Sequence, residues 1–148
     1  MSKQEEKHII QYLNEAYKVR VHNLSKSIEI TEKALKLSRS NETPSLIAKS
    51  LSKLSLYTMI RGDHQKALEL SLEAISIFKS IDDELGIAEV KYSIAGIYYK
   101  SNNYHLGMVY LLDCLTTFRK FKDHHNESRT LKSLGTIYEF LSDYSNAK

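Results

Sequence analysis

The sequence repeats itself at an interval of 40 residues, which restricts the chain to an array of similar units. Asn23, Asp63, Asn103 and Asp143 occupy one phase of this repeat, and each precedes a stretch in which apolar residues recur at helical spacing. An Asn or Asp side chain at such a position accepts hydrogen bonds from the first free backbone amides of a helix. We therefore expect a helix to begin after each of these four residues.

A second series of capping residues, Thr43, Asp83 and Asp123, lies 20 residues out of phase with the first. Pro44 follows Thr43 at the first helical position, where its missing N–H is tolerated. The expected helices span residues 4–20, 24–40, 44–60, 64–80, 84–101, 104–121 and 124–141, and a last helix begins at Tyr144. Because the connections are short, consecutive helices must form antiparallel hairpins, and hairpins repeated at a fixed offset stack into a solenoid.

Small side chains also repeat, at positions where two helix backbones must approach closely. The three series are Ser27, Ala67, Gly107 and Ala147; Ala34, Ala74 and Cys114; and Ser55, Ala95 and Gly135. Large apolar residues recur between them. This alternation predicts helices that interlock in the same way in every repeat.

The composition agrees with an all-α fold and excludes several classes of protein. Five glycines and one proline in 148 residues are too few for the turns of an all-β sandwich or barrel. A net charge of +3 without a basic cluster argues against a nucleic-acid partner. The chain has one cysteine and no apolar run long enough for a signal peptide or a membrane span, so we expect a cytoplasmic protein without membrane contact.

Motifs in three of the repeats resemble the tetratricopeptide repeat. The fourth repeat reads Leu134-Gly135-Thr136-Ile137-Tyr138, then Ser142-Asp143-Tyr144 and Ala147, and the third and second repeats carry related residues at the same spacing. The 40-residue period is similar to the long-repeat branch found in kinesin light chains, Rap-type bacterial regulators and the sensory regions of bacterial histidine kinases and nucleotide cyclases. This resemblance implies a right-handed α-solenoid of about 3.5 repeats.

The repeats divide the chain into residues 8–47, 48–87, 88–127 and a partial repeat at 128–148, which we expect to form one domain. The fourth repeat stops about five residues into its second helix, so Leu134, Ile137, Tyr138 and Leu141 lack a following partner. We therefore expect the chain to be the N-terminal part of a longer protein. The alternative is a homodimer that buries the uncovered C-terminal helix.

The sequence contains no catalytic or metal-binding pattern, so we expect a non-enzyme without metal or cofactor. His124 and His125 are adjacent on a helix, where their side chains diverge and are poorly placed to chelate one ion. Cys114 occupies a repeated alanine position, which predicts a buried, unreactive thiol.

The resemblance also implies that the first helix of each repeat lines a concave binding face. The positions facing this groove include Tyr12, Lys49, Ser52, Lys53, Leu56, Met59, Glu89, Tyr92, Tyr99, Arg129, Lys132 and Glu139. The same phase also contains Ile9, Ala16 and Val19 in the first repeat, Gly96 in the third and Thr136 in the fourth. An apolar and aromatic middle with flanking basic residues suits an extended or helical peptide with apolar anchors and some acidic character.

The interpretation favoured by the sequence is a non-catalytic scaffold that binds a protein or peptide. One alternative is the N-terminal sensory region of a bacterial histidine kinase or nucleotide cyclase whose catalytic part follows residue 148. A Rap-like regulator that responds to an oligopeptide, and a spacer or dimerisation element without a ligand, also remain open.

Overall fold

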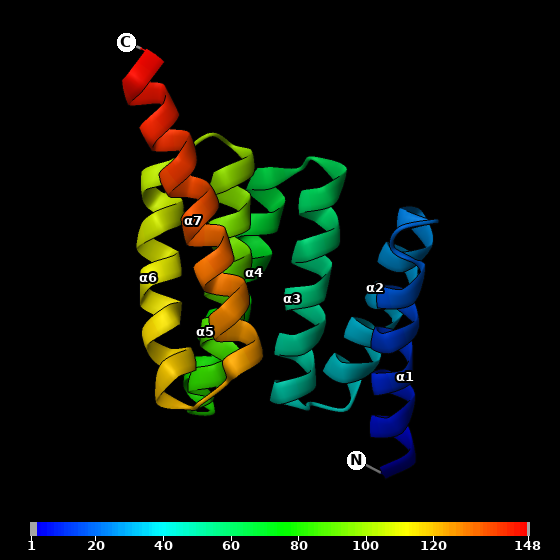
Figure 1. Ribbon diagram of the computed structural model, residues 1–148. Helices are drawn as coiled ribbons and strands as arrows, with labels where there is room; N and C mark the ends of the chain where they lie inside the picture. Colours follow the sequence, from blue (N-terminus) through cyan, green and yellow to red (C-terminus); the bar gives the residue numbers. More distant parts are fainter. Residues whose placement is uncertain (1–2, 148) are drawn as a thin grey trace. The chain divides into compact units, whose positions relative to one another are not determined.

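The computed structural model describes residues 3–147, and the side chains up to Asp143. Over this range the chain is all-α (Figure 1). The helices are α1 (Lys3–Val19), α2 (Leu24–Ser40), α3 (Pro44–Arg61), α4 (His64–Ser80), α5 (Glu84–Lys100), α6 (Tyr104–Lys120) and α7 (His124–Ala147). No described helix combines the length and the hydropathy that crossing a membrane requires.

The expected boundaries of the first six helices agree with the structure to within one residue at each end. The prediction for the fourth repeat was wrong, because Asp143 caps no new helix and α7 continues through it to Ala147. At the turns within each compact unit, between α1 and α4 and between α5 and α7, the following helix packs against the preceding one. No turn interrupts the described backbone at Asp143, so the helix propagates through it.

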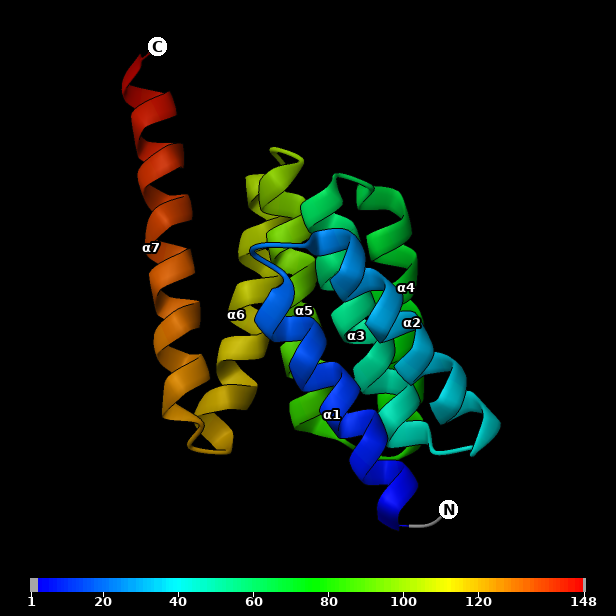
Figure 2. The ribbon, with the colours of Figure 1, turned by 90° about the vertical axis from the view of Figure 1, so that its right-hand side faces the viewer.

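The chain divides into two compact units, the first ending at Asp83 and the second beginning at Glu84. In the first unit α2 packs between α1 and α3, and α3 forms a hairpin with α4. In the second unit α6 packs against both α5 and α7. Figures 1 and 2 show α7 beside α6 and joined to it by the short turn after Lys120.

Five of the turns between helices use the same backbone geometry at an interval of 20 residues. The residue before each new N-cap has positive φ; these residues are Glu42 (49°), Gly62 (101°), Asp82 (55°), Asn102 (63°) and Lys122 (56°). The backbone N–H of the next residue donates to the carbonyl five residues earlier, as Asn103 does to Tyr98 at 2.8 Å and Asp123 to Phe118 at 2.9 Å. This pairing is the Schellman motif, which satisfies the last free carbonyls of a helix.

The N-cap predictions are confirmed at four positions. The side-chain oxygens of Asn23, Asp63, Asn103 and Asp123 accept from the backbone N–H three residues later, at 3.1–3.3 Å. Thr43 is an exception, because its hydroxyl donates to the Asn41 carbonyl at 3.3 Å and makes no capping bond to α3. The N-cap residue thus caps the end of the preceding helix with its backbone N–H. In most turns its side chain also caps the start of the following helix.

Several of the repeated small residues lie where helices approach closely, as expected. In the first unit the Ser55 hydroxyl donates to the Ala67 carbonyl at 2.8 Å and lies 2.6 Å from the Ser71 hydroxyl. In the second unit a methyl group on Gly107 would lie 3.4 Å from the Ala95 carbonyl oxygen. Ala147, a member of the first series, lies outside the residues whose side chains the structure describes.

The packing of α7 corrects the expectation for the C-terminal helix. Leu134 and Ile137 are buried in the core of the second unit with residues of α5 and α6, and Leu141 packs against that core. The uncovered face carries Leu131 and Tyr138, which are 44% and 54% exposed, together with Gly135. A methyl group on Gly135 would have no atom within 4 Å.

The first helix also differs from the expectation. Ile9 and Ala16, expected on the groove face, are fully buried, and Ile9 packs in a core cluster with Leu13, Ala34 and Leu46. Because α1 contacts both α2 and α3, its single apolar stripe must serve both neighbours. The residues of α1 therefore do not face the same way as the residues 40 positions later on α3.

Candidate functional site

The twelve side chains predicted to face the groove lie on α1, α3, α5 and α7, and none of them is buried. Six are exposed: Tyr12, Lys49, Glu89, Arg129, Lys132 and Glu139. The other six are half-buried: Ser52, Lys53, Leu56, Met59, Tyr92 and Tyr99. Their accessibility is compatible with binding, and their role in it stays a prediction.

The second unit contains a pocket of about 200 Å³. It is lined by Tyr92, Ala95, Gly96 and Tyr99 of α5, Leu111 of α6, and Ser133, Thr136 and Ile137 of α7. Ala95, Leu111 and Ile137 belong to the buried core of the unit, so the pocket is backed by a packed apolar layer. Four residues predicted to face the groove, Tyr92, Gly96, Tyr99 and Thr136, line this pocket.

Polar groups lie along one side of the pocket. The Tyr92 hydroxyl is 3.0 Å from the Ser133 hydroxyl, which links α5 to α7. The guanidinium of Arg129 lies 4.6 Å from the centre of the Tyr92 ring and donates to the Asn126 side-chain oxygen at 2.9 Å. The ring and the amide are both neutral partners. Arg129 is therefore held beside the pocket with its positive charge available to a ligand.

Aromatic rings support another wall of the same pocket. Tyr99 packs edge-on against Tyr104 and Phe140, with ring centres 5.6 and 5.7 Å apart. Tyr104 and Phe140 are stacked with their centres 5.4 Å apart. Edge-to-face and offset arrangements of this kind are favourable beyond the area they bury. Tyr99 is thus a fixed wall, while Phe140 is 45% exposed.

In the first unit Lys53 and Arg20 lie over the ring of Tyr17. The Lys53 ammonium is 4.9 Å from the ring centre, and the Arg20 guanidinium is 3.6 Å from it. Arg20 also donates to the Tyr17 carbonyl at 2.6 Å, near the end of α1. Lys53 and Arg20 thus have a structural role beside α1.

Tyr57 of α3 is fully buried, and burial raises the pKa of its phenol to about 12.

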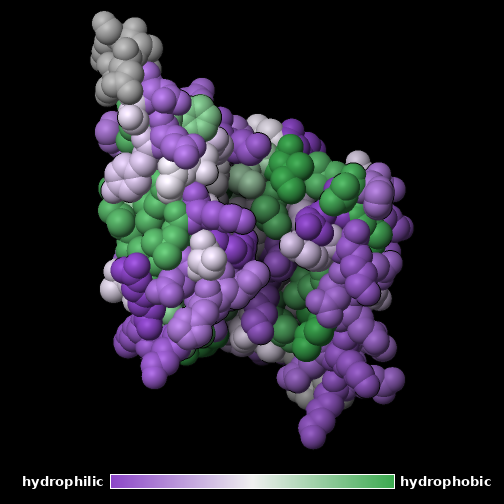
Figure 3. All heavy atoms as spheres, viewed as in Figure 1, coloured by the Kyte–Doolittle hydropathy of each residue, from purple (hydrophilic) through white to green (hydrophobic). Residues whose placement is uncertain are grey.

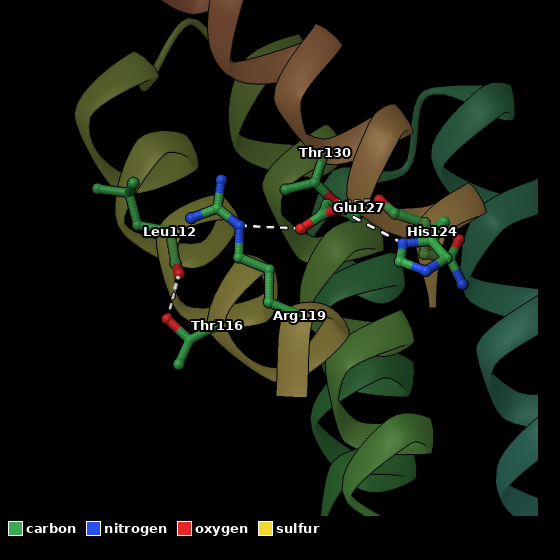
Figure 4. Close-up of polar contacts among 7 residues, drawn as sticks. Leu112, Thr116, Arg119, His124, Glu127 and Thr130 are labelled. Atoms are coloured by element: carbon green, nitrogen blue, oxygen red, sulfur yellow. Dashed lines mark hydrogen bonds and ion pairs between the residues drawn. The ribbon is translucent and has the colours of Figure 1, made fainter. Parts of the chain in front are cut away.

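The residues whose side chains could take part in a reaction or bind a metal do not line the pocket. Cys114 is fully buried, its thiol lies 3.4 Å from the Leu111 carbonyl oxygen, and burial raises the pKa of the thiol to about 11. His124 lies 3.8 Å from Glu127, which accepts from Arg119 at 2.9 Å (Figure 4). Within the described part of the chain, no three His, Cys, Asp or Glu side chains are placed to hold a metal ion.

Apolar side chains also reach the surface outside the pocket. Figure 3 shows them gathered over α6, where Leu106, Val109 and Leu112 are 39%, 59% and 46% exposed. Their spacing of three residues places them on one face of the helix. This face is distinct from the one that supplies Leu111 to the pocket.

Sequence reasoning missed the back of the pocket and the partners of Lys53. Ala95, Leu111 and Ile137 were assigned to packing alone, and the structure shows that they also form the back of the pocket. Tyr17 and Arg20 lie outside the motif positions, so the repeat gave no indication of them. Gly96 and Thr136, by contrast, occupy the groove phase.

No protein-family model matches the sequence, and no curated protein matches it. Among solved structures, BtubC (BKLC) from P. vanneervenii has a TM-score of 0.76 and 22% identity over 94% of this chain and 58% of that chain. A Rap protein complexed with competence and sporulation factor has a TM-score of 0.87 and 17% identity over 99% and 41%. The apo form of RapI has a TM-score of 0.77 and 21% identity over 98% and 41%.

The chain thus spans between 41% and 58% of the length of these solved proteins. At identities of 17–22%, the likeness concerns the fold. It confirms, at that level, an all-α solenoid fold of the long tetratricopeptide-repeat type.

Proposed function

We propose that the chain is a non-catalytic scaffold that binds a protein or peptide through the first-helix faces of its repeats. The observation that carries this proposal is the pocket between α5 and α7 with its apolar back and polar side. A Rap protein of the same fold has been solved with competence and sporulation factor bound, which supports a ligand-binding role for the fold. The single buried cysteine is compatible with a cytoplasmic location.

The size of the pocket suits one side chain of a partner. A cavity of about 150 Å³ in another protein binds benzene, so about 200 Å³ accommodates a side chain such as that of Leu or Phe. Inserting one apolar side chain into a preformed pocket supplies about 1.5–3 kcal/mol of burial. Such anchors dominate binding energy in many interfaces. The remaining contacts would come from the exposed groove residues.

The test is a selection from a random peptide display library, followed by fluorescence anisotropy with the enriched peptides. Thr136→Trp places a large side chain at the pocket and should weaken binding at least tenfold. Thr116→Trp is the matched control, because Thr116 is also exposed and its hydroxyl also bonds to the carbonyl four residues earlier (Figure 4). Absence of enriched peptides, or equal binding to Thr136→Trp and the native chain, would contradict the proposal.

The alternative that this chain is the sensory region of a signalling enzyme stays a prediction. It requires a catalytic domain encoded downstream of the codon for Lys148. A stop codon directly after that codon would refute it.

A further inference from the structure

We propose that the crossing of α1 and α3 binds a phosphate group, which Arg20 and Lys53 hold by charge and the Tyr57 hydroxyl holds by a hydrogen bond. The site lies in the first unit and goes beyond the proposed function, because none of these residues lines the pocket of the second unit. The group is either free inorganic phosphate or the phosphate of a phosphorylated side chain. These two sources share the same chemistry, and the experiment below separates them.

The first observation is a pair of cations without a counter-charge. The Arg20 guanidinium and the Lys53 ammonium lie 3.6 and 4.9 Å from the centre of the Tyr17 ring, and both basic side chains are half-buried. Among the residues that the structure describes, no carboxylate forms an ion pair with either cation. The partners recorded for Arg20 are the ring and the Tyr17 carbonyl oxygen, which are neutral. Two positive charges that are partly withdrawn from water and lack an acidic partner favour an anion beside them.

The second observation is the hydroxyl group of Tyr57, which lies one helical turn after Lys53 on α3. Tyr57 is fully buried, and its hydroxyl has no hydrogen-bond partner within the described part of the chain. A buried donor without an acceptor costs free energy, which a bound group that accepts the hydrogen bond would recover. Burial raises the pKa of this phenol while the charge of Arg20 lowers it, so the guanidinium is close enough to act on the hydroxyl. The unsatisfied donor therefore lies next to the two cations.

The other repeats show that packing does not require these side chains. Ile97 and Ile137 occupy the position of Tyr57 in the next two repeats and are buried, so the core of a repeat is filled without a hydroxyl there. Serine occupies the position of Lys53 in the same two repeats. The buried phenol and the basic residue one turn before it are thus specific to the first unit, which indicates a role other than the shared packing.

The charges and donors of the site favour phosphate over a carboxylate. A phosphate group carries about −1.5 to −2 charges at pH 7 and offers acceptor oxygens in several directions, whereas a carboxylate carries one charge and is planar. The site offers a guanidinium at the end of α1 and an ammonium and a hydroxyl on α3, and both cations form strong charge-assisted hydrogen bonds to phosphate. Lys49, exposed one turn before Lys53, adds to the positive potential of the same helix face.

The test is a titration of the full chain with sodium phosphate at constant ionic strength, followed by backbone amide shifts in two-dimensional NMR. Phosphate should shift the amides of Lys53 and Tyr57 saturably, and acetate should bind at least about fivefold more weakly. Lys53→Gln and Arg20→Gln should each weaken phosphate binding about 3- to 10-fold. Lys100→Gln is the matched control, because Lys100 occupies the position of Arg20 two repeats later and lies in the second unit, and it should leave binding unchanged.

Tyr57→Phe distinguishes a built site from general attraction to surface charge. It removes only the unsatisfied hydroxyl, so it should not destabilise the phosphate-free chain, yet it should weaken phosphate binding about threefold or more. Thermal denaturation measures both effects, because phosphate should raise the melting temperature of the native chain more than that of the variant. Phosphate binding that is unchanged in Tyr57→Phe, or equal binding of acetate and phosphate, overturns the proposal.

N-acetyl-O-phosphoserine amide, compared with N-acetylserine amide, tests the second source of the phosphate group. If the phosphorylated compound binds as tightly as inorganic phosphate, the site accepts a phosphorylated side chain. If only inorganic phosphate binds, the site holds the free anion, and both results support a phosphate site. Saturable shifts from neither compound overturn it. That failure leaves the proposed peptide binding intact, because the pocket of the second unit contains none of these residues.

Discussion

At the scale of single residues, the turns use a backbone conformation that favours glycine, although most of the residues at these positions are not glycine. Left-handed φ suits glycine and costs other L-residues about 1–2 kcal/mol, yet of the five residues with this conformation only Gly62 is a glycine. Asp82 and Asn102 tolerate it better than most side chains, whereas Glu42 and Lys122 have no such advantage.

We predict that Glu42→Gly and Lys122→Gly each raise the free energy of unfolding by up to about 1 kcal/mol, because they relieve this conformational cost. Gly62→Ala should lower it by about 1 kcal/mol. A methyl group at Gly62 would meet no other part of the chain within 4 Å, so this loss comes from the local backbone conformation alone. Chemical denaturation of the three variants checks the signs, and destabilisation by Lys122→Gly would contradict the argument.

Burial of Cys114 predicts a pH-dependent stability. Burial raises the pKa of its thiol from 9.0 to about 11 in the folded chain. Between these values the unfolded chain binds fewer protons, so the free energy of unfolding falls as the pH rises, by an amount on the order of 1–2 kcal/mol. The same reasoning applies to Tyr57 above pH 10, where burial raises the phenol pKa to about 12.

Cys114→Ala isolates the thiol contribution, because alanine occupies the equivalent positions 34 and 74. The variant should be less stable than the native chain at pH 7, owing to the lost packing, and this difference should shrink by pH 10.5. Denaturation at both pH values measures it. A difference that does not change with pH would show that the thiol is not the titrating group.

At the scale of elements, α7 is a first helix whose outer face lacks the contact made by the others. Ser55 on α3 and Ala95 on α5 lie against the second helix of their repeats, whereas Gly135 at the same phase borders open space. A glycine inside a helix costs about 0.5–1 kcal/mol relative to alanine unless a close approach requires it.

We therefore predict that Gly135→Ala stabilises the monomer of this chain, at concentrations below those of self-association, by about 0.5–1 kcal/mol and increases its helical circular dichroism signal slightly. The free energy of unfolding should rise in Gly135→Ala and fall in Gly62→Ala. Because the substitution is the same, this difference in sign reports the backbone conformation and packing of the two positions. Loss of stability in Gly135→Ala would mean that the outer face of α7 is covered in solution.

The sequence predicted most of the helices, because capping residues and small residues are local signals repeated at one interval. It failed where a tertiary contact decides the outcome. Asp143 has the residue type of an N-cap, but without a helix folding back after it the backbone stays helical. Ile9 and Ala16 were misplaced because packing against two neighbouring helices rotates α1. The pocket depends on side-chain volumes meeting across α5, α6 and α7, which no single stretch of sequence records.

At the scale of the whole molecule, the exposed stripe of α7 bears on how the chain associates. Leu131 and Tyr138 are 44% and 54% exposed on either side of Gly135, whereas Leu51 and Thr58, their counterparts on α3, are at most 1% exposed. Two copies of this stripe are self-complementary, because a glycine between two large residues lets a second helix cross closely. We predict that residues 1–148 self-associate through this face.

Sedimentation velocity over a range of concentrations should show a dimer, and Leu131→Lys combined with Tyr138→Lys should shift it toward the monomer. Leu72→Lys is the control, because Leu72 is 50% exposed on α4 and lies off the stripe. The experiment must use this chain alone, since further helices in a longer protein would occupy the same face. A monomer at every concentration would leave the stripe without a self-partner. In that case, stabilisation by Gly135→Ala would be expected to persist at all concentrations, because no copy would need the close approach.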